Sequence, residues 1–210
     1  MSSPSSLFHF SSEVLRKSCP LPKSLFSSSA IKASKIEPLS VFLKQRIKHL
    51  EYSEMEQLIE MIGRQLHHLE VNQNKGVSTF KIDDITVFHA ADDAVYFAIT
   101  NDDNIYDIDE ENQMEIITPV SSTPKHNKAF HSPEYTEFIS KKTIPYKIHF
   151  KSGYYSFGLL CLYCYVTRTP AATTADDFET LFEPIINTKI YWFLKQVLQE
   201  DPMTRRYICV

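Results

Sequence analysis

The sequence predicts an α+β fold, with an antiparallel sheet of about five to six strands and helices on one face of it. Apolar residues recur at helical spacing in residues 39–70 and again in residues 174–198. Between these stretches lie short runs of β-forming residues separated by turn residues. Short links favour antiparallel strands, because a parallel pair needs a long crossover connection. We therefore expect a single domain over residues 37–198, followed by a short tail over residues 199–210.

Residues 1–36 precede this domain and are rich in Ser, basic, poor in acidic residues and without clear periodicity. Such a composition predicts a flexible arm, or a segment that folds onto a partner. The same composition is found in organellar transit peptides, so targeting is an alternative interpretation. Three aromatic residues in the arm, Phe8, Phe10 and Phe26, favour docking over simple solvation.

Residues 39–70 are expected to form one long helix, or two helices that meet near Ser53. Pro38 suits a first helical turn, and Ser53 with Glu56 fits a capping box. Asn72 to Gly76 should end the helix.

The next segment is predicted to contain several strands. Apolar residues on both sides of Asp83-Asp84 indicate a hairpin, and Ala94 to Thr100 indicates a further strand. After a turn at 101–104, residues 105–108 and 114–118 are expected to be short strands, and residues 119–132 a loop.

A small helix is expected to begin at Ser132-Pro133-Glu134 and to end near Lys141-Lys142. The start combines a capping hydroxyl, a first-turn proline and an acid that complements the helix dipole.

The last part of the domain is predicted to be a strand pair and a final helix. Ile144 to Lys151 is read as a strand, Ser152-Gly153 as a turn, and Tyr154 to Thr167 as a long strand. The final helix should begin at Thr174 to Asp177, with a kink or a restart at Pro184.

The segment Ile144-Pro145 to Phe150, followed by Ser152-Gly153 to Leu162, resembles the closing hairpin of GAF domains, with Asp176-Asp177 opening the final helix. The resemblance covers residues 144–198 and implies a sheet with helices packed on it. It also implies a ligand pocket between the sheet and residues 119–142. Asn127-Lys128, Phe130 and Glu134 echo the cyclic-nucleotide signature of that family, but the spacing differs, and we interpret the match as coincidence.

Charge is strongly segregated along the chain, although the net charge is only -4. Residues 1–50 carry eight Lys or Arg and two Asp or Glu, whereas residues 83–115 carry eleven Asp or Glu and no Lys or Arg. The acidic stretch is predicted to be a docking face for a basic partner, or for the basic arm of the same chain. A plain solvated face and a calcium loop are the alternatives, but the pattern lacks the Gly and Glu of such a loop.

The predicted partner-binding residues combine acidic and aromatic side chains, which interfaces use as charged contacts and anchors. They are Asp102, Asp103, Asp107, Asp109, Glu110, Glu111, Tyr154, Tyr155 and Trp192.

No motif for catalysis, for phosphate binding or for a metal is evident, and the chain has only four Gly. Cys161 and Cys164 form a CxxC, which is typical of a redox pair or half a zinc site, but a buried strand there would point the two thiols apart. His126 and His131 lie in the loop without companion ligands. We therefore expect no catalytic residues, no cofactor and no metal.

The combined features predict a non-catalytic adaptor or accessory subunit of a larger assembly, bound to other proteins in a hetero-complex. In size and character the chain resembles small adaptor subunits of bacterial secretion systems. The alternative is a small-molecule-sensing module with a GAF-type pocket. No apolar run reaches the roughly 20 residues of a membrane span. Nucleic-acid binding is not expected of a mildly acidic chain. We expect a cytoplasmic setting, with an organelle as the alternative.

Overall fold

A computed structural model describes residues 33–46, 50–90, 94–117, 130–166, 178 and 181–207. Most of the predicted arm, most of the predicted loop over 119–132, the predicted start of the final helix and residues 208–210 lie outside the described residues.

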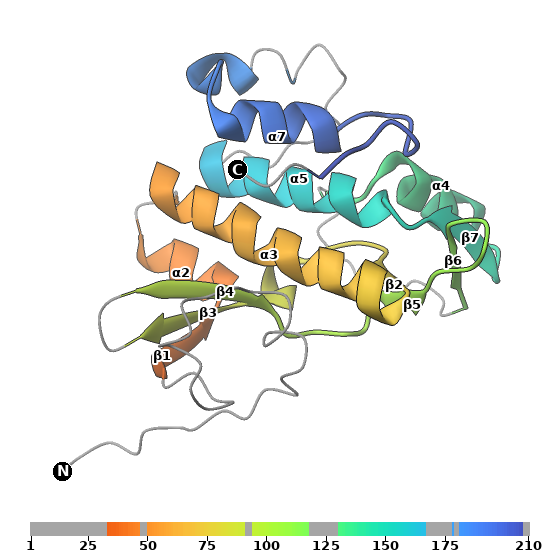
Figure 1. Ribbon diagram of the computed structural model, residues 1–210, viewed down its shortest axis with the longest axis horizontal. Coiled ribbons are helices and arrows are strands. Elements are labelled where there is room, and N and C mark those ends of the chain that lie inside the picture. Colours follow the sequence, from red (N-terminus) through yellow and green to blue (C-terminus); the bar gives the residue numbers. More distant parts are fainter. Residues whose placement is uncertain are drawn as a thin grey trace.

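The elements stack around one long helix, α3 (Tyr52–Gln73), which runs across the molecule in Figure 1. A three-stranded sheet packs on one side of α3, and α5 (Ser152–Val166) and then α7 (Lys189–Val197) follow on the other side. This sheet is antiparallel with the order β1-β3-β4, made by β1 (Ala33–Pro38), β3 (Ile85–Ala90) and β4 (Val95–Ile99).

Two further antiparallel pairs lie together at the other end of α3, on the right of Figure 1. They are formed by β2 (Lys75–Val77) with β5 (Ile105–Asp107), and by β6 (Gln113–Ile116) with β7 (Tyr146–His149). The predicted α+β class and antiparallel pairing are confirmed. The prediction of one sheet with helices on a single face is wrong, because the strands divide into three small sheets with α3 between the largest sheet and α5.

The first described strand starts inside the predicted arm. Residues 33–36 belong to β1, which pairs with β3 through Ala33 opposite Ala90 and Glu37 opposite Val87. Glu37 is buried there and contacts His89 Nε2 at 2.9 Å and Lys35 Nζ at 2.7 Å.

The predicted helical stretch is two helices, α2 (Leu39–Gln45) and α3. The second begins at Tyr52, and its capping box is formed by Glu51 and Glu54 in place of Ser53 and Glu56. It ends, as predicted, at Asn74, which adopts the left-handed conformation. The expected hairpin at Asp83-Asp84 is wrong: Ile82–Asp84 form a short 3-10 turn that leads into β3.

The segment predicted as a turn and a long strand is helix α5, which is the main correction to the sequence-based fold. Ser152 and Gly153 start this helix, and its apolar residues pack against α3 and α7 on opposite sides, so no strand-like alternation arises. A Cβ at position 153 would overlap the Val77 carbonyl, which explains the Gly there. The hairpin on which the resemblance to GAF domains rests is therefore not formed.

The other two helices follow the sequence patterns. Helix α4 (Pro133–Lys141) is capped by Ser132, whose Oγ accepts from the Tyr135 N–H, and it ends at Lys142. Pro184 lies in a short 3-10 turn (Glu183–Ile185), and α7 restarts after it with Thr188 as its cap, so the predicted restart is confirmed.

A side chain of α3 forms hydrogen bonds with backbone groups on the free edge of β4. Gln65 is buried, its Nε2 donates to the Phe97 carbonyl at 3.1 Å, and its Oε1 accepts from the Ile99 N–H at 2.9 Å. A strand edge normally exposes such groups to pairing with another chain. Gln65 satisfies both of them within the fold. Within the described part of the chain, no helix is long and apolar enough to cross a membrane.

Candidate functional site

The predicted acidic residues are exposed along one strand and its two flanking turns, and we call them together the acidic surface. It lies on β5 and on the turns that precede and follow it, and it consists of Asp102, Asp103, Asp107, Asp109, Glu110 and Glu111. All six side chains are exposed.

Two lysines of the chain neutralise part of this surface. Lys147 Nζ lies 2.7 Å from Asp109 Oδ2 and 3.9 Å from Glu111 Oε2, and Lys75 Nζ lies 4.0 Å from Asp107 Oδ1. The hydrogen bond from Lys147 holds the pKa of the Asp109 carboxyl below its ordinary value. Among the described residues no cation lies within ion-pair distance of the other three acids, Asp102, Asp103 and Glu110.

Internal hydrogen bonds fix the turns that carry the acidic residues. Buried Asp84 accepts from the Lys81 N–H at 2.7 Å, from Asn101 Nδ2 at 2.8 Å and from Asn104 Nδ2 at 3.3 Å. Asp109 Oδ1 accepts from the backbone N–H groups of Glu111 and Gln113. In the described ranges, no three His, Cys, Asp or Glu side chains are grouped to hold a metal ion.

The predicted aromatic contacts are only partly exposed. Tyr154 and Tyr155 are buried on α5, each 8 % exposed, so their assignment to a partner surface is wrong. They were read as strand residues, whereas the helix turns both into the core. Trp192 on α7 is 52 % exposed and is free to contact a partner, but it lies on a different element from the acidic surface.

The CxxC lies on helix α5 and not on the strand that was predicted. Cys161 and Cys164 are free thiols in the interior of α5, with no exposed surface. Burial raises the pKa of both thiols above the ordinary value, which suppresses the reactive thiolate. The expected divergence of the two sulfurs on a strand does not apply to a helix, where residues three apart share a face.

Only one of the two histidines of the predicted loop, His131, lies in the part of the chain that the structure describes. His126 lies outside the described residues, and so do residues 119–129 of the segment that would form a GAF-type pocket. His131 Nδ1 lies 3.1 Å from Thr79 Oγ1, and its ring stacks on Tyr135 at 4.8 Å between centroids.

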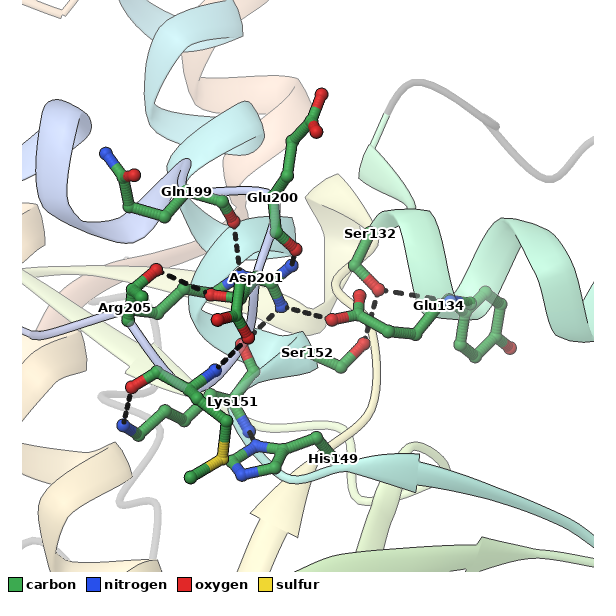
Figure 2. A network of polar contacts seen from close by, with 12 residues as sticks. Ser132, Glu134, His149, Lys151, Ser152, Gln199, Glu200, Asp201 and Arg205 are labelled. Atoms are coloured by element: carbon green, nitrogen blue, oxygen red, sulfur yellow. Dashed lines mark hydrogen bonds and ion pairs between the residues drawn. The ribbon is translucent and has the colours of Figure 1, made fainter.

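A buried arginine near the end of the chain organises a second polar centre, shown in Figure 2. Arg205 has no exposed surface, and its Nε and Nη2 donate to the Gln199 and Glu200 carbonyls, both at 2.6 Å. Its Nη1 donates to the Lys151 carbonyl at 3.3 Å and lies 2.8 Å from Glu134 Oε1. The segment predicted as a tail is therefore fixed into the body, at least over residues 199–207.

The arginine links the C-terminal segment to α4 and α5, which precede it in the sequence. Its guanidinium lies 4.9 Å from the ring centre of Tyr155 on α5, and Glu134 comes from the first turn of α4. Nearby, Ser132 and Ser152 are hydrogen-bonded, and Ser152 also donates to the Ser78 carbonyl. The ends of α4 and α5 and the C-terminal segment are thereby joined by polar contacts (Figure 2).

A cavity of about 240 Å³ lies beside this centre, between α3 and the C-terminal segment. Its walls combine three basic side chains with small, apolar and aromatic ones. The lining residues are Gly63, Leu66, His67, Lys151, Tyr154, Arg205, Arg206 and Tyr207. Sequence reasoning missed this cavity, because its residues come from three separate segments.

Tyr154 in the cavity wall is hydrogen-bonded to a carboxyl with a perturbed pKa, that of Glu70. The Tyr154 hydroxyl donates to Glu70 Oε2 at 2.6 Å, and burial raises the pKa of Glu70 to about 7. The hydrogen bond from Tyr154 and the positive charge of Lys151 oppose that rise without cancelling it. Glu70 lies one helical turn beyond Leu66 and His67, on the same face of α3.

Comparison with family models finds none that matches this chain. No curated protein sequence matches it either.

Proposed function

We propose that this protein is a non-catalytic adaptor that binds other protein subunits through its acidic surface. The observation that supports the proposal is the exposure of six carboxylates on β5 and its flanking turns, three of them without an ion pair in the described residues. Like charges held close together repel one another, and a basic partner surface relieves that repulsion.

The rigidity of the surface also supports a docking role. The bonds of Asp84 to the turn over 101–104, and of Asp109 to its own turn, order the carboxylates before a partner arrives. A surface that is ordered in advance loses less conformational entropy on binding. Electrostatic surfaces of this kind mainly accelerate association and select the partner, and their effect weakens with salt.

The partner that suits this chemistry is a protein with a basic surface, in a hetero-complex. An accessory subunit of a larger assembly, such as a secretion system, is the setting that we propose. Trp192 offers a separate exposed anchor on α7 for a second contact. Tyr154 and Tyr155 have no part in this proposal, because both are buried.

The test is a charge reversal with a matched control. The test variant carries Asp102→Lys and Glu110→Lys, which reverse two exposed, unpaired acids of the acidic surface. The control variant carries Glu183→Lys and Glu200→Lys, which make the same charge change at exposed residues elsewhere. Each variant would be crosslinked in native extract and the bound proteins identified by mass spectrometry. We expect the first variant to lose its partners and the control to retain them. Retention by both variants, or a wild-type protein without partners, would contradict the proposal.

A further inference from the structure

The cavity between α3 and the C-terminal segment has the composition of a small ligand site. Leu66, Tyr154 and Tyr207 supply the apolar and aromatic part of the wall, and Lys151, Arg205 and Arg206 supply cationic groups. Ligand pockets in proteins combine such a largely apolar wall with a few polar groups that orient the ligand. A volume of about 240 Å³ suits a small molecule better than a drug-sized one.

The positive groups of the cavity differ in how far the protein already uses them. Arg205 is occupied by three carbonyls and Glu134, so it cannot bind a further group. Lys151 Nζ has one long hydrogen bond, 3.5 Å to the Met203 carbonyl. Arg206 is exposed, and no carboxylate of the described residues lies within ion-pair distance of its guanidinium. Lys151 and Arg206 are therefore the groups available to an anion.

We propose that this cavity binds a small organic carboxylate, held by Lys151 and Arg206, with its apolar body against Leu66, Tyr154 and Tyr207. Arg side chains bind carboxylates in a two-pronged geometry, and Lys adds a compact point charge. The apolar wall gives the body of such a ligand a place to be buried. This site is independent of the acidic surface, which lies on other elements.

A carboxylate fits the surroundings better than a phosphate dianion does. Glu70 lies on the same face of α3, is hydrogen-bonded to Tyr154 and interacts with the charge of Lys151. A dianion beside this carboxyl meets more repulsion than a monoanion. An inorganic ion also presents only polar surface, so it has no apolar part that could contact the apolar wall of the cavity.

The walls of the cavity are held in place before any ligand enters. Arg205 ties residues 199–200, Lys151 and α4 together, and Tyr207 donates from its hydroxyl to the Ile59 carbonyl at 2.6 Å. Preorganised walls reduce the entropy lost on binding. Arg205 and Tyr207 therefore fix the C-terminal wall of the site, and only the side chains of Lys151 and Arg206 have to turn toward a ligand.

The experiment is a calorimetric titration of the full chain with sodium benzoate, and separately with inorganic phosphate. Lys151→Gln and Arg206→Gln remove the proposed carboxylate contacts, and Lys44→Gln on α2 removes an exposed charge elsewhere as the control. We expect saturable benzoate binding that weakens about tenfold in each of the first two variants and is unchanged in the control. Melting temperatures without ligand should be equal in all four proteins, which shows that folding is intact.

Three results would overturn the inference: no saturable binding of benzoate, equal benzoate affinity in all variants, or binding of phosphate alone. The Asp102→Lys and Glu110→Lys variant should bind benzoate like the wild type. A failure of the ligand site and a failure of the adaptor proposal are therefore distinguishable.

Discussion

The hydroxyl of Tyr154 donates a 2.6 Å hydrogen bond to the carboxyl group of Glu70. Burial raises the pKa of this carboxyl to about 7. In the unfolded chain this carboxyl ionises near its ordinary value of 4.5. Between those two pH values the folded state holds a proton that the unfolded state has lost. The stability of the protein therefore falls as pH rises from about 4.5 to about 7 and stays lower above it.

Glu70→Gln should remove this part of the pH dependence. We expect the variant to equal the wild type at pH ~4 and to exceed it by about 2 kcal/mol at pH ~8, since a partly solvated carboxyl carries less than the full penalty. Urea unfolding at a series of pH values measures this difference in the free energy of unfolding, and Glu110→Gln at an exposed position is the control. Parallel pH profiles for wild type and Glu70→Gln would refute the assignment.

Removal of the buried guanidinium of Arg205 should be strongly destabilising. Arg205→Ala leaves Glu134 and three carbonyls without their cation, and we expect a loss of about 3–5 kcal/mol in the free energy of unfolding. Arg206→Ala, at the exposed neighbouring position, should change stability by no more than about 0.5 kcal/mol.

A second variant separates the buried charge from the lost packing around Arg205. Adding Glu134→Gln to Arg205→Ala should recover part of the loss, because the unpaired carboxylate is then gone. Urea unfolding of the single and double variants gives the coupling between the two residues. Additive losses would show that the pair does not interact.

The ring of Tyr207 leaves no room for a side chain at position 63. A Cβ at position 63 would overlap that ring, so Gly63→Ala should lower the free energy of unfolding by about 2 kcal/mol. In a Tyr207→Ala background the overlap is gone, and the same substitution should stabilise α3 by up to about 1 kcal/mol, because Ala is the better helix former. A substitution that destabilises equally in both backgrounds would contradict the contact.

Gln65 should protect the edge of β4. Gln65→Leu leaves the Phe97 carbonyl and the Ile99 N–H without partners, and we expect a loss of about 2–3 kcal/mol. Hydrogen exchange at the Ile99 amide should accelerate as well. Gln57→Leu at an exposed position of the same helix is the control, and it should change neither quantity appreciably.

The sequence patterns predicted the amphipathic helices best. The apolar stripe of α3, the Ser132 cap of α4 and the restart after Pro184 all have local signatures that tertiary contacts do not override. Helix α5 has no such signature, because neighbours on several sides bury it and its composition is rich in aromatic residues. Continuous apolar runs of this kind do not distinguish a strand from a buried helix.

The candidate sites also divide into those that the sequence reveals and those that only the fold brings together. The acidic residues were predicted to be exposed because their clustering is visible in the sequence itself, and they are. The aromatic assignments at Tyr154 and Tyr155 failed together with the strand that carried them. The cavity depends on residues from α3, from the start of α5 and from 205–207, which only the folded chain brings together.

The hydrogen bond from Tyr207 to Ile59 joins positions 148 residues apart. Together with Arg205, it means that α3 and α5 are fully covered only after residues 205–207 have been synthesised. During synthesis on a ribosome, the long amphipathic helix therefore emerges well before the segment that covers it. Folds dominated by such distant contacts form slowly and leave apolar surface uncovered in the interval. Until residues 205–207 are in place, the face of α3 around Ile59 and Gly63 therefore lacks its cover.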